Sequence, residues 1–298
     1  MSFSTGVKDE LLTEQVLSEC CNHAQAYGLL LFGKAFNART MAFTSEYAPA
    51  AQQYADALMD FCGVGVTVHH GANRMNTVLV RAAADRLKVL NTFGHSQGEI
   101  SLRINRANLN ADCCFGAFVK GAFLSCGTVT SPDKNYHLEF VVNHSKLSAD
   151  LQTLLNEVGF SPKRVIRNAY HVLYFKDSES IEDILTLMGA TNASLEIMSA
   201  KMEKDLRNHA NRRTNFDIAN IGRIVQAGES QRLAVEKIAR TTGLDSLPES
   251  LQKIAKIRLD NPDATLEQIR ELLDEPISRS GVNHRLRKLI DIADKTET

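Results

Sequence analysis

The first two thirds of the chain contain an internal repeat. The segment from Cys20 to Leu31 matches the segment from Cys113 to Leu124, with Cys, Cys, Ala, Gly and Leu recurring at the same spacing and a constant offset of 93 residues. A repeat of this length indicates one structural unit present twice. The chain is therefore expected to contain two copies of one domain.

The residues that follow each matching segment also repeat in kind. Each copy continues with a strand-like run, a helical pattern, a pair of short strands and a closing helix. The predicted runs are 40–45, 51–61, 64–69 with 77–81, and 82–93 in the first copy, and 136–142, 149–158, 164–167 with 171–175, and 180–189 in the second. We predict an α+β fold of two αββαββα-type repeats related by a pseudo-twofold axis, covering residues 1–95 and 96–200.

A glycine occupies the same place in each opening helix, Gly28 in the first and Gly121 in the second. Glycine inside a helix costs about 1 kcal/mol relative to alanine, but it allows another backbone to approach closely. We therefore expect the two opening helices to pack on each other through these glycines. The alternative is that each glycine packs on the sheet of its own copy.

A duplicated helix of this kind, followed by strands, resembles the LAGLIDADG homing endonucleases. The resemblance implies an acidic metal ligand at the end of each opening helix, and alignment on the glycines places Gly33 and Cys126 at those two positions. Hard divalent cations require oxygen ligands, which neither residue supplies. We predict no catalytic residue and no bound metal there; replacement ligands such as Glu46 or Asp112 are the alternative.

Composition limits the remaining classes of function. The net charge is −1, so any DNA-binding charge must be local, and the absence of Trp disfavours a single-strand binder. No signal peptide and no apolar stretch approaching about 18 residues is seen, which predicts a cytoplasmic protein that makes no membrane contact. The six cysteines form no C-x-x-C pair, so we predict reduced thiols, a poor zinc site and no cofactor.

The last third of the chain is predicted to be helical. A basic, amide-rich stretch without apolar periodicity predicts a linker over residues 201–216. Its Arg207, Arg212 and Arg213 are candidates for phosphate contacts, and a merely solvated linker is the alternative. Apolar spacing then predicts separate helices around 218–225, 233–238 and 251–258 in a domain covering residues 217–298.

Two short helices near residues 265–292 predict a helix-turn-helix. Thr265 and Gln268 fit a capping box at the start of the first helix. After the break at Pro276, either Ser278 or Ser280 can cap the second helix, whose inner face carries Val282, Leu286 and Leu289. This is the usual form of a DNA-reading motif.

The outer face of the second helix is basic, and no acidic residue occurs from 277 to 290. Arg and Asn can read guanine and adenine in the major groove, and residues near the N-terminus of such a helix contact bases. Arg279 and Asn283 are therefore predicted to read bases, and Arg287 and Lys288 to contact phosphates. The complete set of predicted DNA-binding residues is Thr265, Gln268, Ser278, Arg279, Ser280, Asn283, His284, Arg285, Arg287 and Lys288. The alternative is a solvated basic helix end.

Nearly the whole chain resembles the WhiA family of Gram-positive bacteria. The similarity is carried by the opening residues 2–11, both Cys-Cys helices, residues 121–129 and 136–139, residues 211–220, and most distinctively the run from Ile277 to Lys288. The resemblance implies a regulator that binds promoter DNA through a sigma-factor-like helix-turn-helix. It also implies roles in cell division, chromosome segregation and sporulation, and association with the nucleoid.

Two other functions remain as alternatives at this level. One is an endonuclease with unusual metal ligands. The other is a scaffold whose repeat domain binds a protein or a small effector. The expected oligomeric state is a monomer.

Overall fold

The computed structural model describes residues 2–13, 18–71 and 74–295. The chain divides into two compact units, Met1–Lys204 and Asp205–Thr298. We call them the repeat unit and the helical unit and describe each by itself. No helix of the described residues is long and apolar enough to cross a membrane.

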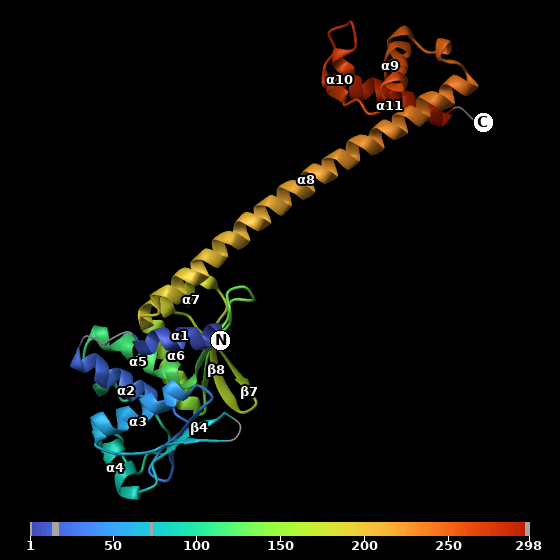
Figure 1. Ribbon diagram of the computed structural model, residues 1–298. Coiled ribbons are helices and arrows are strands. Elements are labelled where there is room, and N and C mark those ends of the chain that lie inside the picture. The colour runs from blue at the N-terminus through green and yellow to red at the C-terminus, as the bar shows by residue number, and fades with distance from the viewer. Residues whose placement is uncertain (1, 14–17, 72–73, 296–298) are drawn as a thin grey trace. The chain divides into compact units, whose positions relative to one another are not determined.

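The repeat unit contains two copies of one αββαββα order, which confirms the predicted fold (Figure 1). The short first strand of each copy, at 35–36 and 127–129, was not among the predicted runs. The first copy comprises α2 (Glu19–Leu31), β1 (Ala35–Phe36), β2 (Met41–Ser45), α3 (Ala48–Cys62), β3 (Val68–His70), β4 (Asn76–Leu79) and α4 (Ala83–Thr92). The second comprises α5 (Asp112–Cys126), β5 (Gly127–Val129), β6 (Leu138–Val142), α6 (Ser145–Glu157), β7 (Lys163–Arg167), β8 (Tyr170–Phe175) and α7 (Ser178–Met188). Helix α1 (Phe3–Thr13) precedes the first copy, and the 3-10 helix η1 (Arg106–Asn108) lies between the copies.

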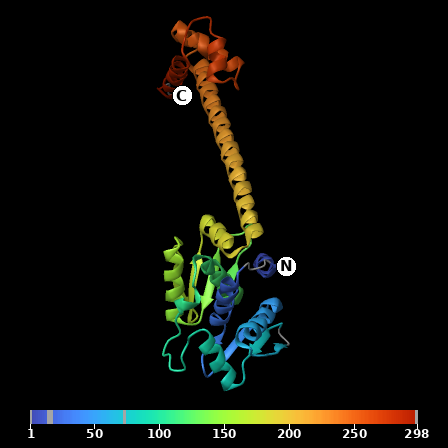
Figure 2. The same ribbon diagram turned by 90° about the vertical axis from the view of Figure 1, so that its left-hand side faces the viewer.

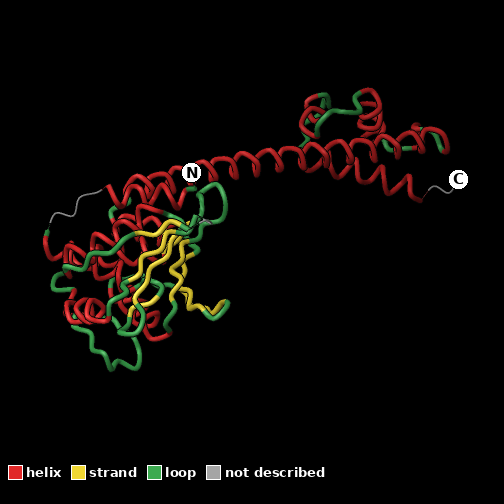
Figure 3. Tube along the Cα trace, turned by 60° about the horizontal axis from the view of Figure 1, so that its bottom comes forward, coloured by secondary structure: helices red, strands yellow, loops and turns green. Residues whose placement is uncertain are grey.

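Each copy forms its own four-stranded antiparallel sheet, and the strand orders correspond. They are β1-β2-β4-β3 and β5-β6-β8-β7. In β6, Leu138, Phe140 and Val142 are buried while the two intervening residues are partly exposed, because successive side chains of a strand point to opposite faces. Figure 2 shows the copies as neighbouring halves, and Figure 3 shows the strands gathered beside the helices.

The two opening helices, α2 and α5, pack directly on each other, as the glycine pattern predicts. A Cβ built on Gly28 would lie 2.2 Å from the carbonyl oxygen of Phe118, and one built on Gly121 would lie 2.1 Å from that of Gln25. Both distances are too short for any side chain, so each glycine is required by the opposite backbone rather than by its own sheet. The helix pair is the centre of the repeat unit, and its ends bring matching residues of the two copies together.

A buried polar network supports the connection between the copies. The Tyr27 hydroxyl lies 2.9 Å from His95 Nε2 and accepts a hydrogen bond from the backbone N–H of Asn105 at 2.7 Å. His95 Nδ1 in turn lies 3.0 Å from the Glu99 carboxylate. Burial raises the pKa of Tyr27, so its hydroxyl stays protonated. The network therefore holds the connecting segment against α2.

The helical unit contains the C-terminal part of α8 (Thr191–Thr241), the 3-10 helix η2 (Leu244–Ser246), α9 (Glu249–Asp260), α10 (Leu266–Glu271) and α11 (Arg279–Lys295). These helices share a second core, separate from that of the repeat unit. It contains Val235, Ile238, Leu251, Ile254, Ile269, Val282, Leu286 and Leu289. The apolar positions predicted for 251–258 and for the helix-turn-helix lie in or against this core. Ile218, Ile221, Val225 and Leu233, which the apolar spacing also marked, are exposed.

Helix α8 corrects one prediction. The helices predicted around 218–225 and 233–238 are parts of one continuous helix, which also includes residues 201–216. The segment lacks apolar periodicity because it is exposed, but it contains no proline and is rich in residues of good helix propensity. At the other end of α8, the Glu10 carboxylate accepts hydrogen bonds from the N–H groups of Asn192 and Ala193 at 2.7 and 3.1 Å.

Candidate nucleic-acid interface

The first helix of the predicted helix-turn-helix begins with the expected capping box. The Thr265 hydroxyl accepts a hydrogen bond from the Gln268 N–H at 3.3 Å, and the Gln268 side-chain oxygen accepts one from the Thr265 N–H at 2.8 Å. These contacts satisfy N–H groups that the first turn of a helix leaves unpaired. Both side chains therefore fix the start of α10. Their predicted contacts with DNA stay predictions.

The second helix, α11, is capped by Ser278 rather than by Ser280. The Ser278 hydroxyl accepts a hydrogen bond from the Gly281 N–H at 3.2 Å, and the Ser278 carbonyl accepts one from the Val282 N–H at 3.0 Å. The Ser280 hydroxyl lies 2.9 Å from that of Ser278. The choice left open by the sequence is thereby settled, and Arg279 becomes the first residue of α11.

A buried arginine fixes the loop that leads into α10. Arg258 is 2% exposed, and its Nη1 donates to the carbonyl oxygens of Asn261, Pro262 and Ala264 at 3.3, 3.0 and 2.8 Å. Gly228 of α8 allows this loop to come close, because a Cβ there would lie 3.0 Å from the Pro262 carbonyl oxygen. The position of α10 thus depends on both α8 and α9.

Helix α11 has one apolar face and one basic face. Val282, Leu286, Leu289 and Ala293 are buried on the first. The other face repeats at intervals of four residues, as a helix requires, and we call it the basic face: Arg279, Ser280, Asn283, His284, Arg287 and Lys288. All of these are exposed except Asn283, which is half-buried. The structure therefore brings together six of the ten predicted DNA-binding residues in one accessible surface.

Arg285 does not belong to the basic face. Its guanidinium lies against the Glu275 carboxylate, with Nη1 at 2.5 Å and Nη2 at 3.3 Å from the two oxygens. The hydrogen bond with Glu275 raises the pKa of Arg285 and lowers that of Glu275. The acid lies in the turn ten residues earlier, outside the stretch that the sequence argument inspected. Arg285 therefore holds the turn against α11, and its contact with DNA stays a prediction.

A cavity of about 360 Å³ lies beside the start of the basic face. Arg279 and Asn283 of α11 line it together with Thr265 and with Arg223 of α8. Sequence reasoning missed Arg223, because only the packing of α8 on the motif places this arginine near α11. The cavity is lined by Arg223, Arg258 and Arg279 on the positive side and by Glu267 on the negative side.

Arg207, Arg212 and Arg213 are exposed positions on α8. Their assignment to phosphate contacts stays a prediction. Because they lie on a regular helix rather than in an irregular linker, their backbone is already ordered.

The positions of the expected catalytic acids hold no carboxylate. Gly33 follows α2, and a Cβ there would lie 3.1 Å from the Ala42 carbonyl oxygen. Cys126 is the last residue of α5, and burial raises the pKa of its thiol to about 12. The nearby Lys8 side chain, which donates to the Leu124 carbonyl at 3.4 Å, supplies no oxygen ligand, and burial lowers its pKa.

Of the two alternative acids, Asp112 lies far from the position of Cys126. Asp112 is the first residue of α5 while Cys126 is the last, which separates them by about 21 Å along a helix that rises 1.5 Å per residue. Glu46 is exposed after β2. Among the described residues, the side chains close enough to share a metal ion are four cysteines at the N-terminal ends of α2 and α5.

Comparison with known proteins agrees with this architecture. The profile of the WhiA C-terminal HTH domain matches residues 210–293, and that of the WhiA LAGLIDADG-like domain matches residues 115–207. A probable cell division protein WhiA of Desulfitobacterium hafniense is 33% identical over 307 residues, covering 100% of this chain and 97% of the relative. The chain belongs to the WhiA family.

Further relatives support the assignment over the full length. A probable cell division protein WhiA of Caldicellulosiruptor saccharolyticus is 32% identical over 310 residues, covering 99% of this chain and 95% of the relative. The crystal structure of full-length DUF199/WhiA from Thermatoga maritima matches with a TM-score of 0.58 at 22% identity, covering 100% of both chains. At that identity the match shows a shared WhiA fold.

Proposed function

We propose that this WhiA protein is a sequence-specific double-stranded DNA-binding regulator of transcription that does not cleave DNA. The basic face of α11 is the observation that carries the proposal. It presents Arg279, Asn283 and Arg287 at successive turns on one accessible side of a helix whose other side is packed in the core. A helix presented in this way fits the major groove.

The position of each side chain along α11 suggests its role. Arg279 and Asn283 lie in the first two turns, where recognition helices contact base edges, and their side chains suit guanine and adenine. Arg287 and Lys288 lie further along and suit phosphates, with Arg223 as an additional phosphate contact. Because each phosphate contact releases counterions, binding is expected to weaken as salt rises.

The ligand chemistry supports the absence of cleavage. Two-metal cleavage needs oxygen ligands on both metal ions, whereas the corresponding positions here carry Gly33 and Cys126, with the Lys8 side chain nearby. The repeat unit therefore acts as a binding or regulatory body in this proposal. A protein or effector bound there is compatible with it.

The cellular role rests on the family. Relatives are named probable cell division proteins, and we infer a role for this chain in regulating cell division genes, with chromosome segregation and sporulation as the further processes that the family resemblance implies. We further propose that the protein binds promoter DNA, that it is cytoplasmic and associated with the nucleoid, and that it is a monomer.

Selection of duplexes from a random pool, using the full-length protein, tests both parts of the proposal. The expected result is enrichment of one sequence motif, and an intact selected duplex after incubation with Mg²⁺ or Mn²⁺. Failure to enrich any motif would refute specific binding. A strand break that copurifies with this chain through successive columns would refute the absence of catalysis.

A further inference from the structure

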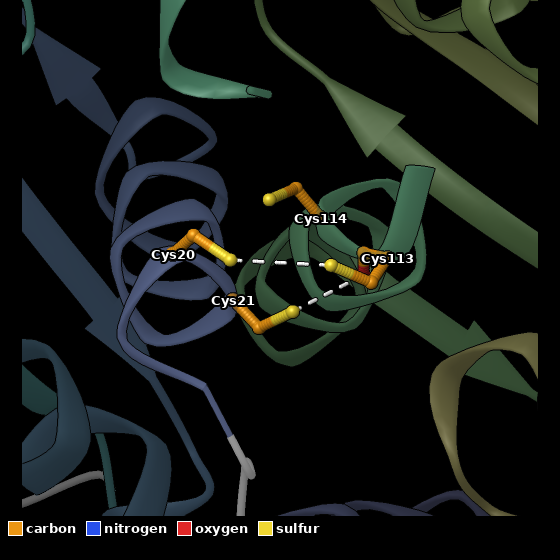
Figure 4. A group of neighbouring side chains, drawn as sticks. All are labelled: Cys20, Cys21, Cys113 and Cys114. Carbon is orange, nitrogen blue, oxygen red and sulfur yellow. Dashed lines mark hydrogen bonds between the residues drawn. The ribbon is translucent and has the colours of Figure 1, made fainter. Parts of the chain in front are cut away.

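Four cysteines meet where the two copies pack together. Cys20 and Cys21 lie in the first turn of α2, and Cys113 and Cys114 lie in the first turn of α5. Figure 4 shows the side chains of the two pairs converging from adjacent helices. The close packing at Gly28 and Gly121 holds these helices together and places the two pairs at the same end.

The distances fit a single tetrahedral metal ion. The four sulfur atoms all lie within 4.8 Å of one another, and Cys20 Sγ lies 3.9 Å from Cys113 Sγ. Four sulfurs bound to zinc at about 2.3 Å lie roughly 3.8 Å apart when the geometry is tetrahedral. Only small adjustments of the side chains would therefore close the site, and a cluster of several metal ions would need more widely separated sulfurs.

The cluster lies where two helices begin, beside a hydroxyl group that faces Cys20. Both cysteine pairs lie at helix N-termini, where the helix dipole and the unpaired N–H groups stabilise negative charge. The Ser18 hydroxyl lies 3.4 Å from Cys20 Sγ and can donate to a thiolate as an outer contact. Cys113 is exposed while Cys21 and Cys114 are buried, so an ion can enter from solvent and be enclosed on the inner side.

We propose that Cys20, Cys21, Cys113 and Cys114 form a structural zinc site that clasps the N-terminal ends of α2 and α5. Binding converts four thiols to thiolates, releases their four protons and changes no oxidation state. The sequence argued against zinc because the cysteines are adjacent and lack C-x-x-C spacing. The structure removes that objection, since two ligands come from each copy and the spacing within one copy does not decide the geometry.

Cobalt titration of the reduced full-length protein, carried out without oxygen, is the direct test. We expect about one Co²⁺ per chain, with the visible bands of tetrahedral cobalt and a thiolate-to-cobalt charge-transfer band, all of which disappear when Zn²⁺ is added. These signals require no variant, so a folding defect cannot obscure the result. Metal analysis of protein purified without chelators is expected to find about one zinc per chain.

Variants distinguish this site from incidental thiol binding. Cys113→Ser changes the exposed ligand, which disturbs packing least, and is expected to weaken cobalt binding by about 100-fold or more. Cys62→Ala, which removes a cysteine of α3 outside the cluster, is the matched control and should leave the titration unchanged. Circular dichroism of both variants checks that the chain remains folded.

Two results would overturn the proposal. The first is a reduced wild-type protein that gives no charge-transfer band; ready formation of disulfides between the two helices on mild oxidation would then make the cluster a redox pair. The second is a band that persists at the same affinity in Cys113→Ser.

Discussion

Gly121→Ala is the substitution that most severely tests the packing of the two copies. The added methyl group would lie 2.1 Å from the Gln25 carbonyl oxygen and 2.7 Å from the Leu29 nitrogen. Both atoms belong to the backbone of α2, so no rotation of a side chain can relieve the contact. The helices α2 and α5 must separate instead.

The magnitude follows from that separation. The 2.1 Å contact is about 1.3 Å short of the 3.4 Å at which ordinary van der Waals contact begins. Overpacking a core costs about 1–3 kcal/mol and sometimes more, while alanine in place of helical glycine returns up to about 1 kcal/mol. Because the clash involves rigid backbone, we expect the upper part of the range and a net loss of about 2 kcal/mol.

Thermal unfolding of the full-length protein measures this loss. A loss of about 2 kcal/mol in a unit of this size lowers Tm by about 4–8 °C. Gly6→Ala is the matched control, because Gly6 lies in α1 of the same unit and a Cβ there meets nothing within 4 Å. The control should raise Tm slightly.

The opposite outcome is easily recognised. If Gly121→Ala is as stable as Gly6→Ala or more stable, the helices do not pack through this glycine. The proposed zinc site would then also be weakened, because it depends on the same packing to bring the two cysteine pairs together.

Three further predictions concern the helical unit and its loops. Thr265→Ala removes the capping box and should destabilise this unit by about 1 kcal/mol in urea unfolding, whereas Thr265→Ser should cost much less; equal losses would contradict the capping role. Arg258→Met leaves three loop carbonyls without their donor and should cost about 1–3 kcal/mol, measured by faster hydrogen exchange in the loop before α10, and unchanged exchange would argue against its role. The hydrogen bond from Arg285 lowers the pKa of Glu275 below its ordinary 4.5. The stabilisation from this pair is therefore present above that value and is lost as pH falls through the pKa of Glu275 in the folded protein. Glu275→Gln should abolish this loss of stability at low pH, and a stability profile against pH that is unchanged in the variant would refute the pairing.

The local patterns of this sequence predict its elements well. The repeat offset, the alternation in strands such as Leu138–Val142 and the capping box at Thr265 each depend on residues close together in the chain. Their geometry is set by backbone periodicity, so the order of elements could be predicted. The packing of the two opening helices could be predicted for a different reason. A glycine that destabilises a helix, present at the same place in both copies, indicates a close approach of another backbone.

The features that the sequence did not predict depend on contacts that local spacing does not reveal. The pairing of Arg285 with Glu275 joins α11 to the turn before it, and the place of Arg223 beside the motif arises from the packing of α8. The cysteine cluster joins residues 93 positions apart, so no local spacing rule could find it. The continuous helix α8 was divided in the prediction because an exposed helix needs no apolar period.

The ratio of affinities for a selected duplex and a scrambled duplex tests the basic face most directly. Fluorescence anisotropy at fixed salt would compare the wild-type protein with the Arg279→Ala/Asn283→Ala double variant and with Lys256→Ala, which removes an exposed charge from α9. Loss of two base contacts of at least about 1 kcal/mol each should lower the ratio by about 25-fold or more, while Lys256→Ala leaves it unchanged. A double variant that retains the wild-type ratio would show that α11 does not read the sequence.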